Sequence, residues 1–364
     1  MADRDATQAN GDALAAVTDV AEGIAWQADH CQRAGAPCTA RIVRAELAIL
    51  KTDTATGRRL ANWHGKVLED ALPLRVAGGL HHLHLSGADK RLQPVYAGLV
   101  TDQDSVDAIV TASAEQFDNL LLPWLDSAPQ TNEAGRSANI MAALLWLSGK
   151  LGPRFELIEI GASAGINTMM GRFHFDLGGV TVGPSLSSMR IEPEWRGAPP
   201  PRAEVEITDI AGCDTAPVDL TDPAQALRLK SYVWSDAIPR LARLDTAIAM
   251  AKRVAPELAR MDAAQFVADR LARPQEEGVT RVLFHTVVWQ YLPPATRDEI
   301  TGMMEEAGAS ATPERPLAWI QVEINRATFS HDTSVRYWPG GENETQLAKA
   351  HPHGTWVEWL APDT

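Results

Sequence analysis

The chain has 364 residues, of which 45% are hydrophobic and 22% charged, a composition typical of a globular enzyme of one large or two moderate domains. A net charge of −14 without any run of Lys and Arg predicts no nucleic-acid partner, because a polyanionic backbone would be repelled. Three cysteines without metal spacing, no signal-peptide pattern and no apolar run near the ~18 residues of a membrane span predict a soluble cytoplasmic protein.

Residues 1–129 are predicted to form a helical N-terminal cap region. Apolar residues at three-to-four spacing predict amphipathic helices over 23–35, 40–51 and 105–125. The stretch 72–87 has the least helical pattern here, with paired glycines before a histidine cluster. On a strand, at most His82 and His84 of that cluster share a face. No carboxylate spacing joins them to the later histidines His351 and His353, so we expect no metal site.

Residues 130–364 are predicted to form the second domain. It opens with a helix over 131–152, with Thr131 or Asn132 at its cap, Glu133 in its first turn and glycines at its end. Five strands then alternate with helices, and we predict them over 155–160, 203–214, 257–263, 279–289 and 316–325. This alternation predicts an α/β Rossmann-like fold with a mostly parallel sheet. Residues 172–202, a hairpin and a proline-rich excursion, form an insertion, and a C-terminal antiparallel hairpin turns at Pro339-Gly340-Gly341.

The sequence Gly161-Ala162-Ser163-Ala164-Gly165 follows the first predicted strand and fits two catalytic patterns. As G-x-S-x-G it matches the elbow that carries the nucleophilic serine of many hydrolases, with Ser163 as nucleophile. It also matches a glycine loop between a strand and a helix, the usual seat of a nucleotide-like cofactor.

The position of the loop in the chain favours the cofactor pattern. A hydrolase elbow normally follows several strands, whereas the residues before 150 look helical. Glu159 also stands where an elbow strand is usually apolar, and at a cofactor loop it can hold an ammonium or a ribose hydroxyl. Gly161 and Gly165 allow a sharp turn and close backbone approach, and the helix start that contains Asn167 offers free N–H groups. A later Asp332 and the histidines of "HPHG" leave the hydrolase order Ser, Asp, His open.

Six motifs carry a resemblance to a bacterial family with a domain of unknown function, number 2332, over most of the chain. They are "QTNEAGRSA" (130–138), "LIEIGASAGIN" (157–167), "GCDTAPVDL" (212–220), "VWSDAIPRLARLDTAIAMA" (233–251), "VLFHTVVWQYLP" (282–293) and "HPHGTWVEWL" (351–360). As a group these motifs are specific, but the family has no settled activity.

The strand order also resembles that of class I S-adenosylmethionine-dependent methyltransferases. The resemblance implies that their E/D-x-G-x-G-x-G loop corresponds to Glu159, Gly161 and Gly165, with Ser163 in place of the middle glycine. It implies S-adenosylmethionine as cofactor.

The same resemblance implies further cofactor contacts. The ribose-binding acid would be Asp214 or else Asp209, and the adenine side would be Asp262-Ala263. Asp214 lies 49 residues after Gly165 instead of the ~20 of a compact fingerprint, which requires the insertion described above.

Two polar clusters are candidates for holding the acceptor. His285 ends the fourth predicted strand, and Trp289, Gln290 and Tyr291 begin the loop after it, at the end of a parallel sheet where ligands collect. The second cluster is Asn132, Glu133 and Arg136, which can orient a polar substrate or form a capped helix start with an ion pair. We expect this turn within ~10 Å of the glycine loop, close enough for charges to couple, with His285 lining the same pocket.

The sequence therefore predicts a methyltransferase that uses S-adenosylmethionine on a small-molecule acceptor. Catalytic candidates are His285, Glu133, Arg136 and Tyr291, with His285 or Glu133 as base where the acceptor must lose a proton. The alternatives are a serine hydrolase built on Ser163 and a non-catalytic Rossmann-like binding protein.

Overall fold

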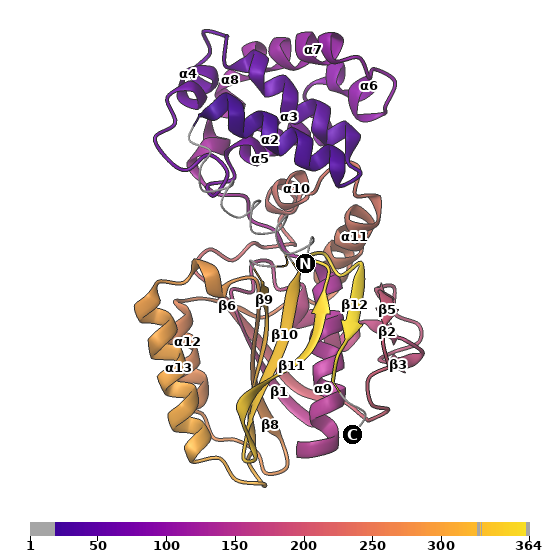
Figure 1. Cartoon of the computed structure of the whole chain (residues 1–364), viewed down its shortest axis with the longest axis vertical. Coiled ribbons are helices and arrows are strands. Elements are labelled where there is room, and N and C mark those ends of the chain that lie inside the picture. The colour runs from indigo at the N-terminus through magenta and orange to yellow at the C-terminus, as the bar shows by residue number, and fades with distance from the viewer. Residues whose placement is uncertain (1–18, 326–327, 329, 362–364) are drawn as a thin grey trace, which may run out of the picture. The chain divides into compact units, whose positions relative to one another are not determined.

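The computed structural model describes residues 19–325, 328 and 330–361 (Figure 1). The chain forms two compact units. The first comprises 1–131 and 222–242, and the second comprises 132–221 and 243–364. The boundary predicted at 129/130 assigns 222–242 to the second domain, whereas the structure assigns this segment to the helical unit.

The first unit is built from helices (Figure 1), and buried apolar side chains of several of them pack in one large hydrophobic cluster. Its α-helices are α2 (Val20–Arg33), α3 (Pro37–Ile49), α4 (Ala55–Ala61), α5 (Leu72–Leu85), α6 (Gln93–Tyr96), α7 (Gln103–Gln116), α8 (Asp118–Leu121) and α10 (Pro223–Ser231), with short 3-10 turns η1 (Lys90–Leu92) and η2 (Leu122–Asp126). The helices predicted over 23–35 and 40–51 are confirmed as α2 and α3. The helix predicted over 105–125 is divided, because the backbone leaves the helical conformation at Phe117.

Helix α5 corrects the interpretation of 72–87 as the least helical stretch. Its paired glycines do not make a turn but allow neighbours to pack closely. A Cβ on Gly78 would lie 2.8 Å from the ring of Tyr232, and one on Gly79 would lie 2.9 Å from Leu121. The glycine pair therefore marks close helix packing, for which the sequence around it carries no signal.

The helix also changes which histidines lie together. His81 and His84 are three residues apart and share a face of α5, where both rings stack on Tyr96 at centroid distances of 5.1 and 4.4 Å. The expectation that, as on a strand, at most His82 and His84 share a face is wrong.

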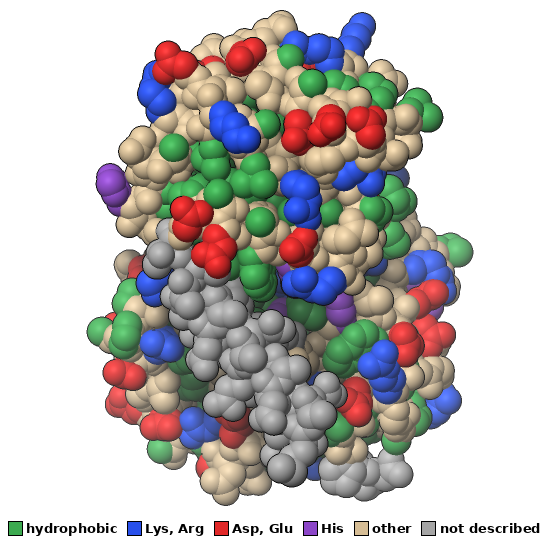
Figure 2. Space-filling model, turned by 45° about the horizontal axis from the view of Figure 1, so that its top comes forward, with side chains coloured by type: hydrophobic (Ala, Val, Ile, Leu, Met, Phe, Trp, Pro, Cys, Tyr) green, Lys and Arg blue, Asp and Glu red, His purple; other side chains and the backbone are tan. Residues whose placement is uncertain are grey.

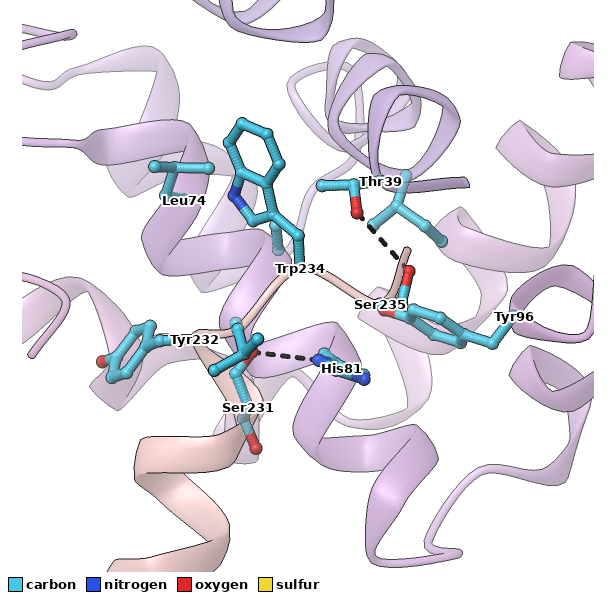
Figure 3. A pocket seen from close by; sticks show the side chains of 12 residues that line it. Thr39, Leu74, His81, Tyr96, Ser231, Tyr232, Trp234 and Ser235 are labelled. Atoms are coloured by element: carbon cyan, nitrogen blue, oxygen red, sulfur yellow. Dashed lines mark hydrogen bonds between the residues drawn. The ribbon is translucent and has the colours of Figure 1, made fainter. Parts of the chain in front are cut away.

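A small cavity of about 290 Å³, counted with its open mouth, lies within this unit beside segment 231–235 (Figure 3). At its edge Thr39 Oγ1 donates to Asp236 at 2.7 Å, and the same carboxylate accepts two backbone N–H groups at the start of α3. His81 Nδ1 lies 3.1 Å from the carbonyl oxygen of Ser231, and burial lowers the pKa of His81 to about 4, so the ring is neutral at pH 7. These contacts explain why residues 222–242 belong to the helical unit.

The second unit contains a nine-stranded sheet in the order β5-β12-β11-β10-β9-β8-β1-β6-β7. Its parallel run consists of β1 (Arg154–Ile160), β6 (Glu206–Asp214), β7 (Leu258–Arg260), β8 (Thr280–Thr286) and β9 (Leu317–Ile324). In space these strands follow the order third, second, first, fourth, fifth, which is the Rossmann order. The predicted α/β Rossmann-like fold with a mostly parallel sheet is confirmed.

The antiparallel part of the sheet is larger than predicted. The hairpin at Pro339-Gly340-Gly341 is confirmed as β10 (His331–Trp338) and β11 (Gly341–Ala350). Strand β10 also pairs with β9, and β11 pairs with β12 (Trp356–Trp359). At the edge, β12 pairs in parallel with β5 (Glu194–Arg196), a strand from the proline-rich excursion. The rest of the insertion forms a three-stranded sheet of β2 (His174–Leu177), β3 (Val180–Val182) and β4 (Arg190–Ile191).

Helices cover both faces of the sheet. Helices α12 (Ala263–Leu271) and α13 (Pro294–Ala309) lie on one face, and α9 (Ser137–Leu151) lies on the other (Figure 1). Ile158, Ile160 and Leu283 pack with the buried side chains of α12 and α13. Because strand side chains alternate, Glu159 points to the α9 face. Helix α11 (Ile238–Arg253) contains the division between the units at 242/243.

The described surface shows charges of both signs. On the face in Figure 2, Lys and Arg side chains are interspersed with Asp and Glu, and the described residues there form no continuous basic patch. Across residues 19–325, 328 and 330–361, no helix combines the length and apolarity that a bilayer span requires.

Candidate functional site

The glycine loop follows β1 at the carboxyl end of the sheet and has an unusual backbone. Gly161, Ser163 and Gly165 have φ angles of 66°, 54° and 68°. This left-handed region suits glycine and is uncommon for serine. The loop is held by β6, because Ala162 N donates to Cys213 O at 2.9 Å and Ser163 N donates to Asp214 Oδ2 at 2.9 Å. The loop conformation therefore depends on the second strand as well as the first.

The structure decides between Asp214 and Asp209 as the acid at the end of the second strand. Asp209 lies opposite Glu156 in the sheet register and pairs with Arg270 at 2.6 Å, well before the carboxyl edge. Asp214 ends β6 beside the loop, where its second oxygen accepts from Ala216 N at 2.9 Å. Asp214 is therefore the acid at the ligand-binding edge.

Glu159 is a buried carboxyl group at the end of β1, with 1% of its surface exposed. Its Oε1 accepts from Asn167 Nδ2 at 3.1 Å, while Oε2 and Asn167 Oδ1 are buried without a hydrogen-bond partner among the described residues. Burial and, to a smaller extent, the nearby negative charge of Asp214 raise the pKa of Glu159 to about 8, against the hydrogen bond from Asn167. Its Oε2 therefore has room for a hydrogen-bond donor or a cation from a ligand.

The Asn132–Arg136 turn lies beside the glycine loop, as predicted. Asn132 Oδ1 accepts from Ile166 N, the residue after Gly165, at 2.7 Å. Arg136 is buried, and its charge lowers the pKa of Glu159 and contributes, after burial, to lowering that of His331 to about 4. The expected proximity of this turn and the loop is confirmed.

The local structure of the turn differs from the predicted helix start. Residues Ala134–Arg136 form the 3-10 turn η3, α9 begins at Ser137, and Asn132 binds the loop instead of capping a helix. Glu133 is 4% exposed, accepts from Gly135 N at 3.1 Å and pairs with Arg243 at 3.0 Å. Arg136 Nε donates to the carbonyl oxygen of Pro352 at 3.0 Å, so the "HPHG" segment packs against this turn.

Asp262 and Ala263 follow β7 at the same edge of the sheet. Asp262 is the N-cap of α12 and accepts from Ala264 N at 2.8 Å, while Ala263 is buried as the first residue of the helix. The helix-capping role is therefore observed, and a role on the adenine side of a cofactor stays a prediction.

His285 does not share the Glu159 side of the sheet. It follows Leu283 by two residues and so points to the α12 and α13 face, whereas Glu159 points to the α9 face. The His285 ring is fully buried, stacks on Trp289 at 5.0 Å and bonds Glu323 Oε1 through Nδ1 at 2.6 Å. The expectation that His285 lines the same pocket as the glycine loop is wrong, because strand alternation places it on the opposite face.

Glu323 is the site residue that the sequence analysis missed. Its Oε1 also accepts from the backbone N–H groups of Val288 and Trp289 at 3.1 and 3.3 Å. Burial alone would raise the pKa of Glu323, but these bonds and the one from His285 outweigh it and lower the pKa. An acid in the apolar strand 316–325 was a usable signal, since it stands near the carboxyl end of a predicted parallel strand.

The loop after β8 presents the remaining acceptor candidates. Trp289, Gln290 and Tyr291 form the 3-10 turn η5. Trp289 is partly covered by its stacking on His285, whereas 73% of the Tyr291 side chain is exposed. Tyr291 is therefore free to contact a ligand at the sheet edge, and Trp289 mainly supports the turn.

A family model described as an uncharacterized protein conserved in bacteria (DUF2332) matches residues 21–359. The chain belongs to this family. The family resemblance of the six motifs is confirmed, and the likeness to methyltransferases stays a prediction. No curated protein and no solved structure matches the chain.

In this DUF2332 chain, Ser163 lacks the surroundings of an activated nucleophile. Its side chain is 5% exposed, and its Oγ has no hydrogen-bond partner among the described residues. A catalytic serine needs a general base within hydrogen-bond reach. Ser163 shares with a hydrolase elbow its G-x-S-x-G sequence and its positive φ.

The histidines of the DUF2332 chain do not form a metal centre in the described part of the structure. No three His, Cys, Asp or Glu side chains within residues 19–325, 328 and 330–361 converge in an arrangement that could hold a metal ion. The rings of His351 and His353 instead contact each other at 5.5 Å.

Proposed function

We propose that this DUF2332 chain is an S-adenosylmethionine-dependent methyltransferase that acts on a small-molecule acceptor. The glycine loop follows β1, and the strand order reverses between β1 and β8, where open parallel sheets bind ligands. The observation that carries the proposal is Glu159, a buried carboxyl group directly before this loop with one oxygen unpartnered among the described residues.

The charge of this edge favours S-adenosylmethionine over other nucleoside cofactors. Glu159 has a pKa of about 8, so a cation beside it would convert it to the ionised form and be held in return. S-adenosylmethionine carries an ammonium and a sulfonium group. Dinucleotides and nucleoside triphosphates bring phosphate charges that the carboxylate of Asp214 would repel, and the loop from 161 to 167 contains no Lys or Arg to offset them.

The residues at the edge fit the parts of such a cofactor. Glu159 and Asn167 would hold its amino-acid end, because both have a buried oxygen without a partner among the described residues. Asp214 accepts a backbone hydrogen bond at each carboxylate oxygen, and each oxygen has a second acceptor site for a ribose hydroxyl. Asp262 and Ala263 would border the adenine.

When bound, S-adenosylmethionine would supply a methyl group on a sulfonium leaving group. The chain would then contribute alignment and exclusion of water, which need few reactive side chains. Asn132, Glu133 and Arg136 form the polar wall beside the loop and would orient the acceptor. Glu133 is the better candidate for a base, because His285 is buried behind Trp289 on the other face of the sheet.

Calorimetric titration of the full chain with S-adenosylmethionine, S-adenosylhomocysteine and NAD tests the proposal. We expect both sulfur nucleosides to bind and NAD not to bind. Glu159→Gln should weaken S-adenosylhomocysteine binding by about tenfold or more, because it removes the charge that faces the ammonium group. Glu344→Gln is the matched control, since it removes an exposed acid on β11. Binding of NAD alone, or equal affinity of wild type and Glu159→Gln, would contradict the proposal.

A further inference from the structure

The loop after β8 has a backbone that its sequence does not favour. Val287 has a φ of 58°, in the left-handed region that β-branched residues rarely adopt. Such a conformation persists only where the surroundings hold it, and these conformations gather at ligand sites and switch regions. The question is which contacts hold Val287 and its neighbours in place.

Glu323 accepts three hydrogen bonds from this segment. The single oxygen Oε1 accepts from His285 Nδ1 at 2.6 Å, from Val288 N at 3.1 Å and from Trp289 N at 3.3 Å. The side chain of His285 adds a stack on Trp289, with centroids 5.0 Å apart and planes 11° apart. Side chains from two strands, β8 and β9, thus anchor the turn where it leaves the sheet. The hydrogen bond from Val287 N to Val322 O at 3.0 Å extends the pairing of these strands to the strained residue itself.

The turn anchored in this way packs against the glycine loop. A Cβ placed on Gly161 would lie 2.3 Å from Val288 Cγ2, so Val288 occupies the space directly over this glycine. Any ligand that enters the loop shares this space with Val288. The position of Val288 therefore sets the room beside Gly161.

We propose that Glu323 and His285 are positioning residues that hold the 287–291 turn against the glycine loop and thereby shape one wall of the cofactor site. The part of this inference that concerns the cofactor rests on the proposed function. The anchoring of the turn by Glu323 and His285 follows from their contacts alone. Neither side chain needs to touch a ligand, since both act through the backbone of Val288 and Trp289.

Hydrogen exchange of the full chain without ligand tests whether Glu323 and His285 anchor the turn. In Glu323→Ala, the amides of Val288 and Trp289 lose their acceptor, and we expect them to exchange at least about tenfold faster. Protection within β8 and β9 should stay close to wild type. Glu323→Gln keeps a carbonyl oxygen at the same place and should restore most of the protection. His285→Phe keeps the stack on Trp289 but removes one donor and should loosen the turn less than Glu323→Ala.

The outcomes distinguish specific anchoring of the turn by Glu323 and His285 from ordinary core packing. Unchanged exchange at Val288 and Trp289 in Glu323→Ala, or an equal loss of protection throughout β8 and β9, would overturn the inference. If Glu323→Ala does not fold, the comparison of His285→Phe with Glu323→Gln decides, because only the former should loosen the turn. The exposed-acid variant Glu344→Gln should match wild type in every amide of the turn.

Titration with S-adenosylhomocysteine adds the link to the cofactor. We expect Glu323→Ala to weaken its binding by about tenfold, and Glu323→Gln to rescue it. If wild type does not bind S-adenosylhomocysteine, the proposed function fails, but hydrogen exchange still tests whether Glu323 and His285 anchor the turn. If wild type binds and the loosened variant binds equally well, the turn does not shape the cofactor site, and that part of the inference is refuted.

Discussion

The buried carboxyl of Glu159 should make the stability of the protein fall as the pH rises. Its pKa is about 8 in the folded chain, against an ordinary value of 4.5. Below pH 4.5 the group is protonated in both states and contributes nothing. Between pH 4.5 and 8 the unfolded chain releases the proton while the folded chain keeps it, so stability is lost in this window. Above pH 8 the loss is complete.

The size of the effect follows from the same two values. The difference between 8 and 4.5 is 3.5 units, and each unit corresponds to about 1.4 kcal/mol, which gives an upper limit of about 5 kcal/mol. Glu159→Gln removes the ionisable group and keeps an oxygen for Asn167 Nδ2. The variant should therefore gain stability over wild type as the pH rises, by up to about 1.4 kcal/mol per unit.

Urea unfolding of wild type and Glu159→Gln from pH 5 to 8.5 measures this difference directly. Glu344→Gln removes an exposed acid on β11 and serves as the control, which should run parallel to wild type. A difference between Glu159→Gln and wild type that stays constant across the whole pH range would refute the reasoning. It would mean that Glu159 is ionised throughout and already has a compensating partner.

Three further predictions follow from the loop. If the ammonium group of a ligand ionises Glu159, binding of S-adenosylhomocysteine at pH 7 should release about 0.9 proton from this carboxyl group. Calorimetry in buffers of different ionisation enthalpy measures the release, and zero release would contradict the prediction. Ser163→Gly should raise the free energy of unfolding by about 1 kcal/mol, because glycine tolerates the left-handed backbone. A fluorophosphonate should not label wild type, and stoichiometric labelling of Ser163 would establish the hydrolase instead. Gly161→Ala should lower stability by about 1–3 kcal/mol through its contact with Val288, whereas Gly302→Ala, in open space on α13, should not; equal effects in urea unfolding would contradict the close contact.

The parallel strands could be predicted because their pattern is local. Buried apolar runs such as 155–160 and 279–289 need no knowledge of distant residues, and both became strands of the Rossmann order. Helix α5 could not be recognised in this way. Its Gly78 is explained by the ring of Tyr232, which is more than 150 residues away in the chain, and no local pattern reveals that contact. The assignment of 222–242 failed for the same reason.

The candidate site was predicted in part. The sequence placed Asn132 and the glycine loop together correctly, because a helix that runs antiparallel to β1 returns its start to the carboxyl edge of the sheet. It placed His285 at the right end of β8 but on the wrong side. The face was available from strand alternation, since Leu283 and Ile158 share the α12 and α13 face, but only once the pairing of β1 with β8 is known.

Two glutamates at the same edge of the sheet, Glu159 buried and Glu323 partly buried, differ in the hydrogen bonds that they accept. Glu323 lies on one face and accepts three hydrogen bonds at one oxygen, and its pKa is lowered despite burial. Glu159 lies on the other face and accepts one, and its pKa is raised to about 8. Since both acids lie at strand ends and burial raises the pKa of each, the difference comes from the number of donors that the fold supplies. The fold gives Oε1 of Glu323 three donors, while its Oε2 has no partner among the described residues, and it gives Glu159 one donor, so we expect a ligand that brings a cation or a donor to bind at Glu159.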